Sequence, residues 1–132
     1  MTLGEVRILK RRNEQIGILI IINDAPYGTE KAYNALRLVM MLKKQDPDLK
    51  VRVFLLGNSV NCAIPNQKTP PGYYNVETML KSVINKGVEV KACGTCLEAR
   101  GLKNLDLIEG VQSSNMVELS EWVCGVDKVM TF

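Results

Sequence analysis

The stretch Ile16-Gly17-Ile18-Leu19-Ile20-Ile21-Ile22 decides the fold. It is short, rich in β-branched residues and continuously apolar, a pattern typical of a central strand covered on both faces. The turn residues Asn23-Asp24-Ala25-Pro26-Tyr27-Gly28 follow it at once. The run therefore predicts the first buried strand of a sheet, with a loop directly after it.

Outward from this strand, the sequence alternates between helical and extended patterns. Apolar residues at helical spacing predict one helix from Thr29, its N-cap, to about Lys44, and a second from its N-cap Asn75 to Gly87. The other predicted elements are strands at 51–56, 88–92 and 129–132, a short strand opening at Val111, short helical pieces at 97–100 and 104–107, and a helix capped by Ser113 or Ser114 that carries Met116, Leu119 and Val123.

This alternation predicts one α/β domain over residues 1–132, with a polar lead-in at 1–14. Strands separated by helices form a mostly parallel sheet with right-handed crossovers, so we expect a single-domain doubly wound fold with helices on both faces. Loops after parallel strands share the carboxyl edge of the sheet, where ligands bind at the topological switch point. The loops that hold Asp24, Cys62 and Cys93 are therefore expected to converge on one cleft.

The composition narrows the class of protein. At 132 residues, with 46% hydrophobic and 23% charged residues, the chain can bury one core without disulfides. The net charge of +3 is modest and the basic residues are scattered, apart from Lys10-Arg11-Arg12, so no nucleic-acid partner is expected. The apolar run at 16–22 is too short to span a bilayer and too deep for a signal peptide, which predicts a cytoplasmic protein without a membrane partner.

The chain has no histidine and four cysteines. Ser-His-Asp catalysis, Cys-His catalysis and His-bearing zinc sites are therefore excluded for an isolated chain. No G-x-G-x-x-G or Walker pattern supports a nucleotide, and no cofactor is expected. The chemistry that the sequence indicates is therefore that of cysteine thiols in a reducing compartment.

The Cys93-Gly94-Thr95-Cys96 segment follows the predicted strand at 88–92 and precedes a helical piece. A helix N-terminus stabilises a thiolate through unpaired backbone N–H groups and the helix dipole, so Cys93 is predicted to be the most reactive thiol. Gly94 permits close approach of a ligand to the backbone. Lys91 and Arg100 are candidates for adding positive potential.

The C-x-x-C spacing leaves three chemistries open. They are a dithiol/disulfide redox pair, half of a metal site, and a sulfur-carrying cysteine whose persulfide the second thiol resolves. A structural zinc site needs four ligands, and Cys62 and Cys124 form no second C-x-x-C, so no metal is expected. The alternative without chemistry is two ordinary buried thiols.

Several other residues have a structural interpretation beside a functional one. Asp24 either binds a ligand amine or forms an Asx-turn. Cys62 either joins the site from the long segment 58–74 or is incidental, and Cys124 is expected to pack in the core. On the first predicted helix, Leu38 and Met41 fall outside the core face, so they lie either under neighbouring loops or against another subunit.

Three segments resemble the DsrE/DsrF-like family, which includes the DsrE, TusD and YchN-like sulfur-relay proteins. They are the loop Asp24-Ala25-Pro26-Tyr27-Gly28, the strand Val88-Glu89-Val90-Lys91-Ala92-Cys93 running into Ala99-Arg100-Gly101-Leu102, and the ending Val126-Asp127-Lys128-Val129-Met130-Thr131-Phe132. With their order and spacing, the resemblance covers most of the chain from Ile16 to Phe132.

The resemblance implies a homo-oligomer, a trimer or hexamer, and a sulfur carrier or sulfurtransferase. It implies that Cys93 accepts sulfane sulfur as a persulfide, from a donor protein or a small sulfane-sulfur donor, and passes it to an acceptor. Cys96 departs from the sulfur-relay subunits, which keeps a thiol/disulfide redox function open; a non-enzymatic oligomeric binding protein is the third hypothesis. Cys93 and Cys96 are the candidate catalytic residues, and the candidate ligand-binding residues are Asp24, Tyr27, Cys62, Gly94, Thr95 and Arg100.

Overall fold

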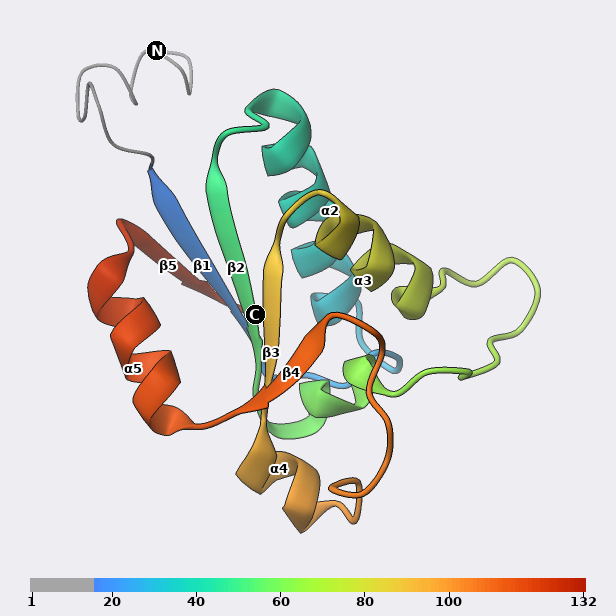
Figure 1. Cartoon of the computed structure of the whole chain (residues 1–132). Coiled ribbons are helices and arrows are strands. Elements are labelled where there is room, and N and C mark those ends of the chain that lie inside the picture. The colour runs from blue at the N-terminus through green and yellow to red at the C-terminus, as the bar shows by residue number, and fades with distance from the viewer. Residues whose placement is uncertain (1–15) are drawn as a thin grey trace.

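The computed structural model describes residues 16–132, so the predicted lead-in at 1–14, with its Lys10-Arg11-Arg12 cluster, lies outside the described residues. The described chain forms a five-stranded sheet in the order β4-β3-β2-β1-β5, with every neighbouring pair parallel (Figure 1). The elements are β1 Gly17–Ile22, α2 Lys31–Gln45, β2 Lys50–Leu55, the 3-10 helix η1 Gly57–Ala63, α3 Val76–Asn85, β3 Glu89–Cys93, α4 Gly94–Ala99, β4 Val111–Ser114, α5 Met116–Gly125 and β5 Lys128–Thr131.

Helices cover both faces of this sheet, as the alternating pattern predicted. Helices α2 and α3 pack together on one side, and α5 lies on the other side (Figure 1). On the α5 side, the rings of Trp122 and Phe54 pack edge to face, with 6.0 Å between the ring centroids. The single-domain α/β fold and its parallel sheet are confirmed.

Two predicted helix starts and one predicted helical segment need correction. Helix α2 begins at Lys31 with Glu30 as its N-cap, so Thr29 lies one residue before the predicted cap position. The Thr29 hydroxyl donates to Asp24 (3.0 Å) and accepts the Lys31 N–H (3.4 Å). Helix α5 is capped by Asn115, whose side chain accepts the Glu118 N–H, because the two predicted serines still belong to β4. Residues 104–107 form no helix, and η1 was not predicted.

Two predictions about apolar side chains have different outcomes. Leu38 is partly buried and packs against the core, which favours the wide-face interpretation for this residue, whereas Met41 is exposed. Cys124 is exposed near the end of α5, so the expectation that it packs in the core is wrong. The helical period alone does not reveal that α5 covers the sheet only with Leu119 and Trp122.

The carboxyl ends of the strands lead straight into the segments that carry the polar chemistry. β3 passes into α4 without an intervening loop, because Cys93 is the last residue of the strand and the N-cap of the helix. This tight junction requires Gly94. A Cβ atom built on Gly94 would lie 3.0 Å from Ser113 Oγ and 3.1 Å from the Ser114 carbonyl oxygen.

We predict that Gly94→Ala destabilises the protein by about 1–3 kcal/mol through overpacking against β4. The Ser113 hydroxyl can rotate away, but the Ser114 carbonyl is fixed in its strand. Gly125→Ala is the matched control, because Gly125 is also helical and a Cβ there meets nothing within 4 Å. Urea unfolding of the two variants measures the difference; equal stabilities would contradict the close packing of α4 on β4.

Candidate functional site: a thiol pair at the carboxyl edge

Cys93 and Cys96 lie together where β3 turns into α4. The backbone N–H of Cys96 donates to Cys93 Sγ, with 3.4 Å between nitrogen and sulfur, and the two thiol groups also interact with each other. Both cysteines are free thiols. The chain turn that the sequence predicted therefore brings the two sulfur atoms within reach of one another.

Cys93 is the inner thiol of the pair. It is 5% exposed, and burial is the main reason that its thiol pKa is raised. The Cys96 thiol raises the pKa further, while the backbone N–H groups of Cys96 and Thr95 oppose the shift and do not reverse it. The expectation that the helix N-terminus makes Cys93 a stabilised thiolate is therefore wrong, because desolvation outweighs the N–H groups.

Cys96 is the outer thiol and is half-buried. The backbone N–H of Gly57 donates to Cys96 Sγ across an N···S distance of 3.3 Å. Gly57 begins η1 one residue beyond Leu56, which follows β2, and it holds a positive φ of 56°, a conformation that favours glycine. The Gly57 donor was not predicted from the sequence, although a glycine and polar turn residues after a buried strand are a signal for such a group.

Arg100 fixes the outer side of the same site. Its Nε and Nη2 atoms donate to Asn58 Oδ1 at 3.0 and 2.9 Å, and Nη1 donates to the Cys96 carbonyl oxygen at 3.0 Å. The guanidinium thus ties α4 to the start of η1 beside Cys96. Lys91 does not act in this way, because its ammonium pairs with Glu118 of α5 at 2.9 Å.

Asp24 and Tyr27 have structural partners in the first loop. Asp24 accepts the Thr29 hydroxyl and lies 3.9 Å from the Lys31 ammonium. These are side-chain contacts and not the predicted Asx-turn, because the residue two positions on is Pro26, which has no N–H to donate. The Tyr27 hydroxyl accepts the Val76 N–H at the start of α3 (3.0 Å), and its ring packs against those of Tyr73 and Tyr74. These contacts hold loops together, and none of them leads to the thiol pair.

Cys62 is 2% exposed in η1 and belongs to the hydrophobic core. Burial raises the pKa of its thiol to about 12, so it stays protonated at neutral pH. The structure thus favours the incidental interpretation of Cys62 over a ligand-binding one. The chain before Cys62 does contact the thiol pair, through Gly57 and through Asn58 at the start of the segment 58–74.

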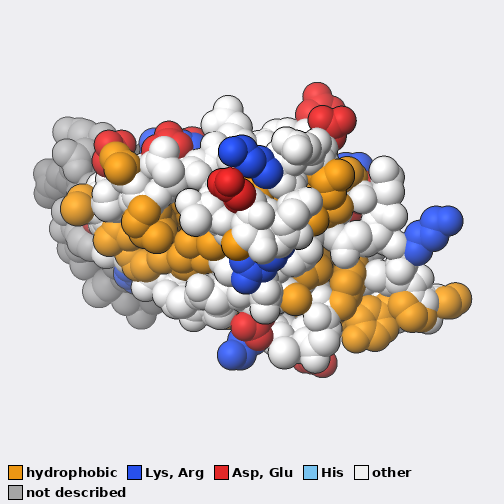
Figure 2. Space-filling model, turned by 90° about the horizontal axis from the view of Figure 1, so that it is seen from below, with side chains coloured by type: hydrophobic (Ala, Val, Ile, Leu, Met, Phe, Trp, Pro, Cys, Tyr) orange, Lys and Arg blue, Asp and Glu red, His pale blue; other side chains and the backbone are white. Residues whose placement is uncertain are grey.

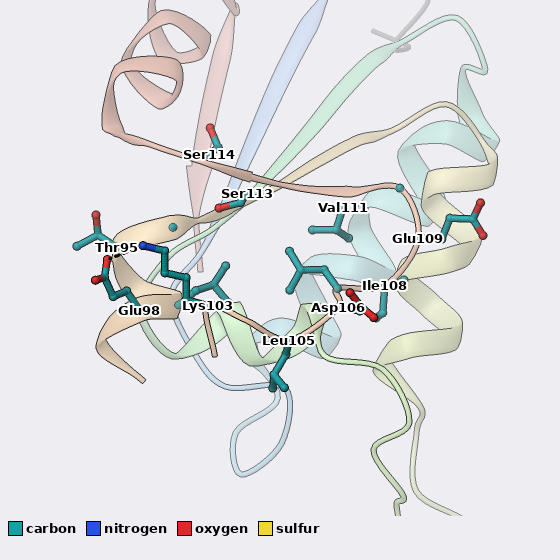
Figure 3. Close-up of a pocket in the computed structure, with 14 residues that line it drawn as sticks. Thr95, Glu98, Lys103, Leu105, Asp106, Ile108, Glu109, Val111, Ser113 and Ser114 are labelled. Atoms are coloured by element: carbon teal, nitrogen blue, oxygen red, sulfur yellow. Dashed lines mark ion pairs between the residues drawn. The ribbon is translucent and has the colours of Figure 1, made fainter. Parts of the chain in front are cut away.

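A separate pocket of about 770 Å³ lies between α4 and β4. Thr95 and Glu98 line it from α4, Ser113 and Ser114 from β4, and the segment 103–110 closes it (Figure 3). Gly94 and Thr95 therefore face this pocket, whereas neither cysteine belongs to its lining. The one cleft expected from the sequence is instead two neighbouring places, a thiol pair on the η1 side and a pocket on the β4 side.

Within residues 16–132, no group of three or more Cys, Asp or Glu side chains is arranged to hold a metal ion. None of the helices in this part of the chain is long and apolar enough to cross a membrane. The half-metal-site alternative therefore gains no support from the described residues. What the arrangement can do chemically is exchange sulfur or electrons between two adjacent thiols.

The fold and the site define a small α/β protein with a parallel sheet and a dithiol at its carboxyl edge. The chain belongs to the DsrE/DsrF-like family, which matches residues 17–132. This membership supports a sulfur-relay type of role in general terms.

Relatives and a solved structure agree with this assignment. Protein YchN of Escherichia coli K12 is 42% identical over 115 residues, which cover 87% of this chain and 97% of that protein. The uncharacterized protein MJ0989 of Methanocaldococcus jannaschii is 42% identical over 113 residues, covering 86% and 96%. The crystal structure of the Escherichia coli YchN protein aligns with a TM-score of 0.85 at 41% identity, covering 90% of this chain and all of that one (100%).

The buried Cys62 thiol predicts a specific loss of stability in alkali. A thiol whose pKa is about 12 in the folded protein and about 9.0 when unfolded binds its proton more tightly in the folded state. Its contribution is therefore fully present below about pH 9 and is lost as the pH rises towards 12.

We expect the free energy of unfolding of the wild type to fall by about 1–3 kcal/mol more than that of Cys62→Ala between neutral pH and about pH 11. Urea titrations at a series of pH values measure this difference. Cys124→Ser removes an exposed thiol and should follow the wild type throughout. Parallel curves for wild type and Cys62→Ala would contradict the buried thiol.

Proposed function

We propose that this protein is a sulfur carrier in a sulfur relay, and that the Cys93–Cys96 pair holds one sulfane sulfur with Cys93 as the persulfide-bearing residue. The observation that carries the proposal is the adjacency of the two thiols, with the Cys96 N–H on Cys93 Sγ and the Gly57 N–H on Cys96 Sγ. Membership of the DsrE/DsrF-like family supports the same chemistry.

The surroundings of the pair suit a persulfide. Backbone N–H groups donate to both sulfur atoms and can interact favourably with the partial negative charge of a persulfide. Burial of Cys93 keeps a bound sulfane sulfur away from bulk thiols that would remove it. The chemistry needs reduced cysteines, which is why we place the protein in the cytoplasm, with a sulfur donor and an acceptor as its partners.

Thiol/disulfide exchange is the second candidate function. The contact of 3.4 Å between the Cys96 nitrogen and Cys93 Sγ favours it, because it brings together the two cysteines that a disulfide would join. The two functions predict different changes in the mass of the protein. A carrier gains one sulfur atom that a reductant removes, whereas a redox pair only loses two hydrogen atoms on oxidation.

We expect the reduced wild-type protein to gain one reducible sulfur atom from glutathione persulfide, and Cys93→Ser/Cys96→Ser to gain none. Intact-mass spectrometry before and after a reductant measures the gain. Cys124→Ser, which keeps the pair, is the control and should load like the wild type. A wild-type protein that only forms an internal disulfide would replace the carrier function with the redox function.

We also propose that the protein is a homo-oligomer, and that α5 and β5 contribute to its interface. Large apolar side chains are exposed on both elements, and hydrophobic side chains gather on that side of the molecule, at the left of Figure 2. The exposed residues are Met116, Val117 and Val123 on α5, and Val129 and Met130 on β5.

Light scattering on the purified full chain tests the assembly. The wild type should be an oligomer, trimer or hexamer, and Val117→Lys should shift it towards the monomer, because a charge would be desolvated in the contact. The matched control is Leu105→Lys, which places the same charge at an equally apolar exposed residue away from α5 and β5. A monodisperse wild-type monomer at all working concentrations would reject the proposal.

A further inference from the structure

We propose that Cys96, and not Cys93, is the thiol that takes sulfur from the donor, and that Cys96 then hands it to Cys93. This inference rests on the proposed carrier function and assigns the order of events within its site. It reverses the order that the sequence predicted, in which Cys93 meets the donor first.

Access is the first argument. A thiolate that attacks a donor must approach its outer sulfur in line, which requires an open path to the nucleophile. Cys93 is 5% exposed at the end of β3, whereas Cys96 is half-buried and lies one helical turn further out. The donor therefore reaches Cys96 before it can reach Cys93.

Hydrogen bonding is the second argument. Cys96 Sγ accepts the N–H of Gly57, so its donor comes from the first residue of η1 and not from α4 itself. Arg100 holds the Cys96 carbonyl and Asn58 at once, which fixes α4 against η1 and keeps this N–H aimed at the sulfur. The Cys96 sulfur is thus held in one position, at the accessible side of the pair.

Two exchange steps follow from this geometry. In the first, the Cys96 thiolate attacks the outer sulfur of a persulfide R–S–SH; the bond from Cys96 to that sulfur forms, the donor S–S bond breaks, and the donor leaves as R–S⁻. In the second, Cys93 attacks the same outer sulfur, the Cys96–sulfur bond breaks, and the Cys93 proton passes to Cys96. The products are a Cys93 persulfide and a Cys96 thiol, with no net oxidation or reduction.

The experiment compares single variants in a Cys124→Ser background, with glutathione persulfide as the donor and quenched intact-mass spectrometry as the readout. Cys96→Ser should load at least tenfold more slowly than the parent. Cys93→Ser should still gain the sulfur, on Cys96, and should lose it to added glutathione several-fold faster than the parent, because the outer persulfide is not sheltered. Cys93→Ala repeats the test if a buried serine hydroxyl impairs folding.

A second measurement needs no variant at the pair. Brief treatment of the same Cys124→Ser protein with iodoacetamide, followed by peptide mapping, should label Cys96 before Cys93. Labelling of Cys93 first, or loading of Cys96→Ser at the parental rate, would overturn the assignment while leaving the carrier function intact. A parent protein that gains no sulfur at all would instead refute the carrier function, and the order of transfer with it.

Discussion

The burial of β1 on both faces and along both edges is the constraint on which the rest of the structure depends. Leu19, Ile20 and Ile22 have no exposed surface, and β2 and β5 pair with the strand on either side. The chain connects such a strand to its parallel neighbours only through crossovers, and a crossover places a helix on one face of the sheet. Parallel pairing then brings the carboxyl ends of all the strands to one edge.

That edge is where backbone groups without sheet partners become available. The end of β2 is tied to the end of β1 by Ser59, whose buried hydroxyl donates to the Ile22 and Leu56 carbonyl groups. The tie fixes the start of η1, and the Gly57 N–H there turns to the sulfur of Cys96. Gly57 and Cys96 are 39 residues apart in the sequence, and the parallel sheet brings them into contact.

The two thiols of the pair sit in different environments because they sit at different depths. Cys93 ends a strand inside the sheet layer and loses solvent there, which raises its pKa. Cys96 stands on the first turn of α4, beside η1 and Arg100. Two neighbouring thiols that differ in solvent exposure can take different roles, and the proposed ordered transfer of sulfur requires this difference.

The sequence by itself determined most of the helices and strands and the place of the two cysteines in the fold. The apolar run at 16–22, the helical spacing after Thr29 and after Asn75, and the C-x-x-C segment after a strand predicted a parallel α/β domain with a dithiol at the strand end. These features are local, so periodicity, turn residues and spacing suffice to find them. The missed cap at Asn115 and the missed η1 lie where turn chemistry offers several equivalent residues.

Only the tertiary structure decided which thiol is open and what surrounds it. Burial depends on the packing of segments far apart in the chain, so the depth of Cys93, the isolation of Cys62 and the exposure of Cys124 could not be read from spacing. The same holds for the Gly57 N–H on Cys96 and for the pocket that Thr95 lines and the two cysteines do not. A helix N-terminus can be predicted from a sequence, but the desolvation that opposes it is a property of the whole fold.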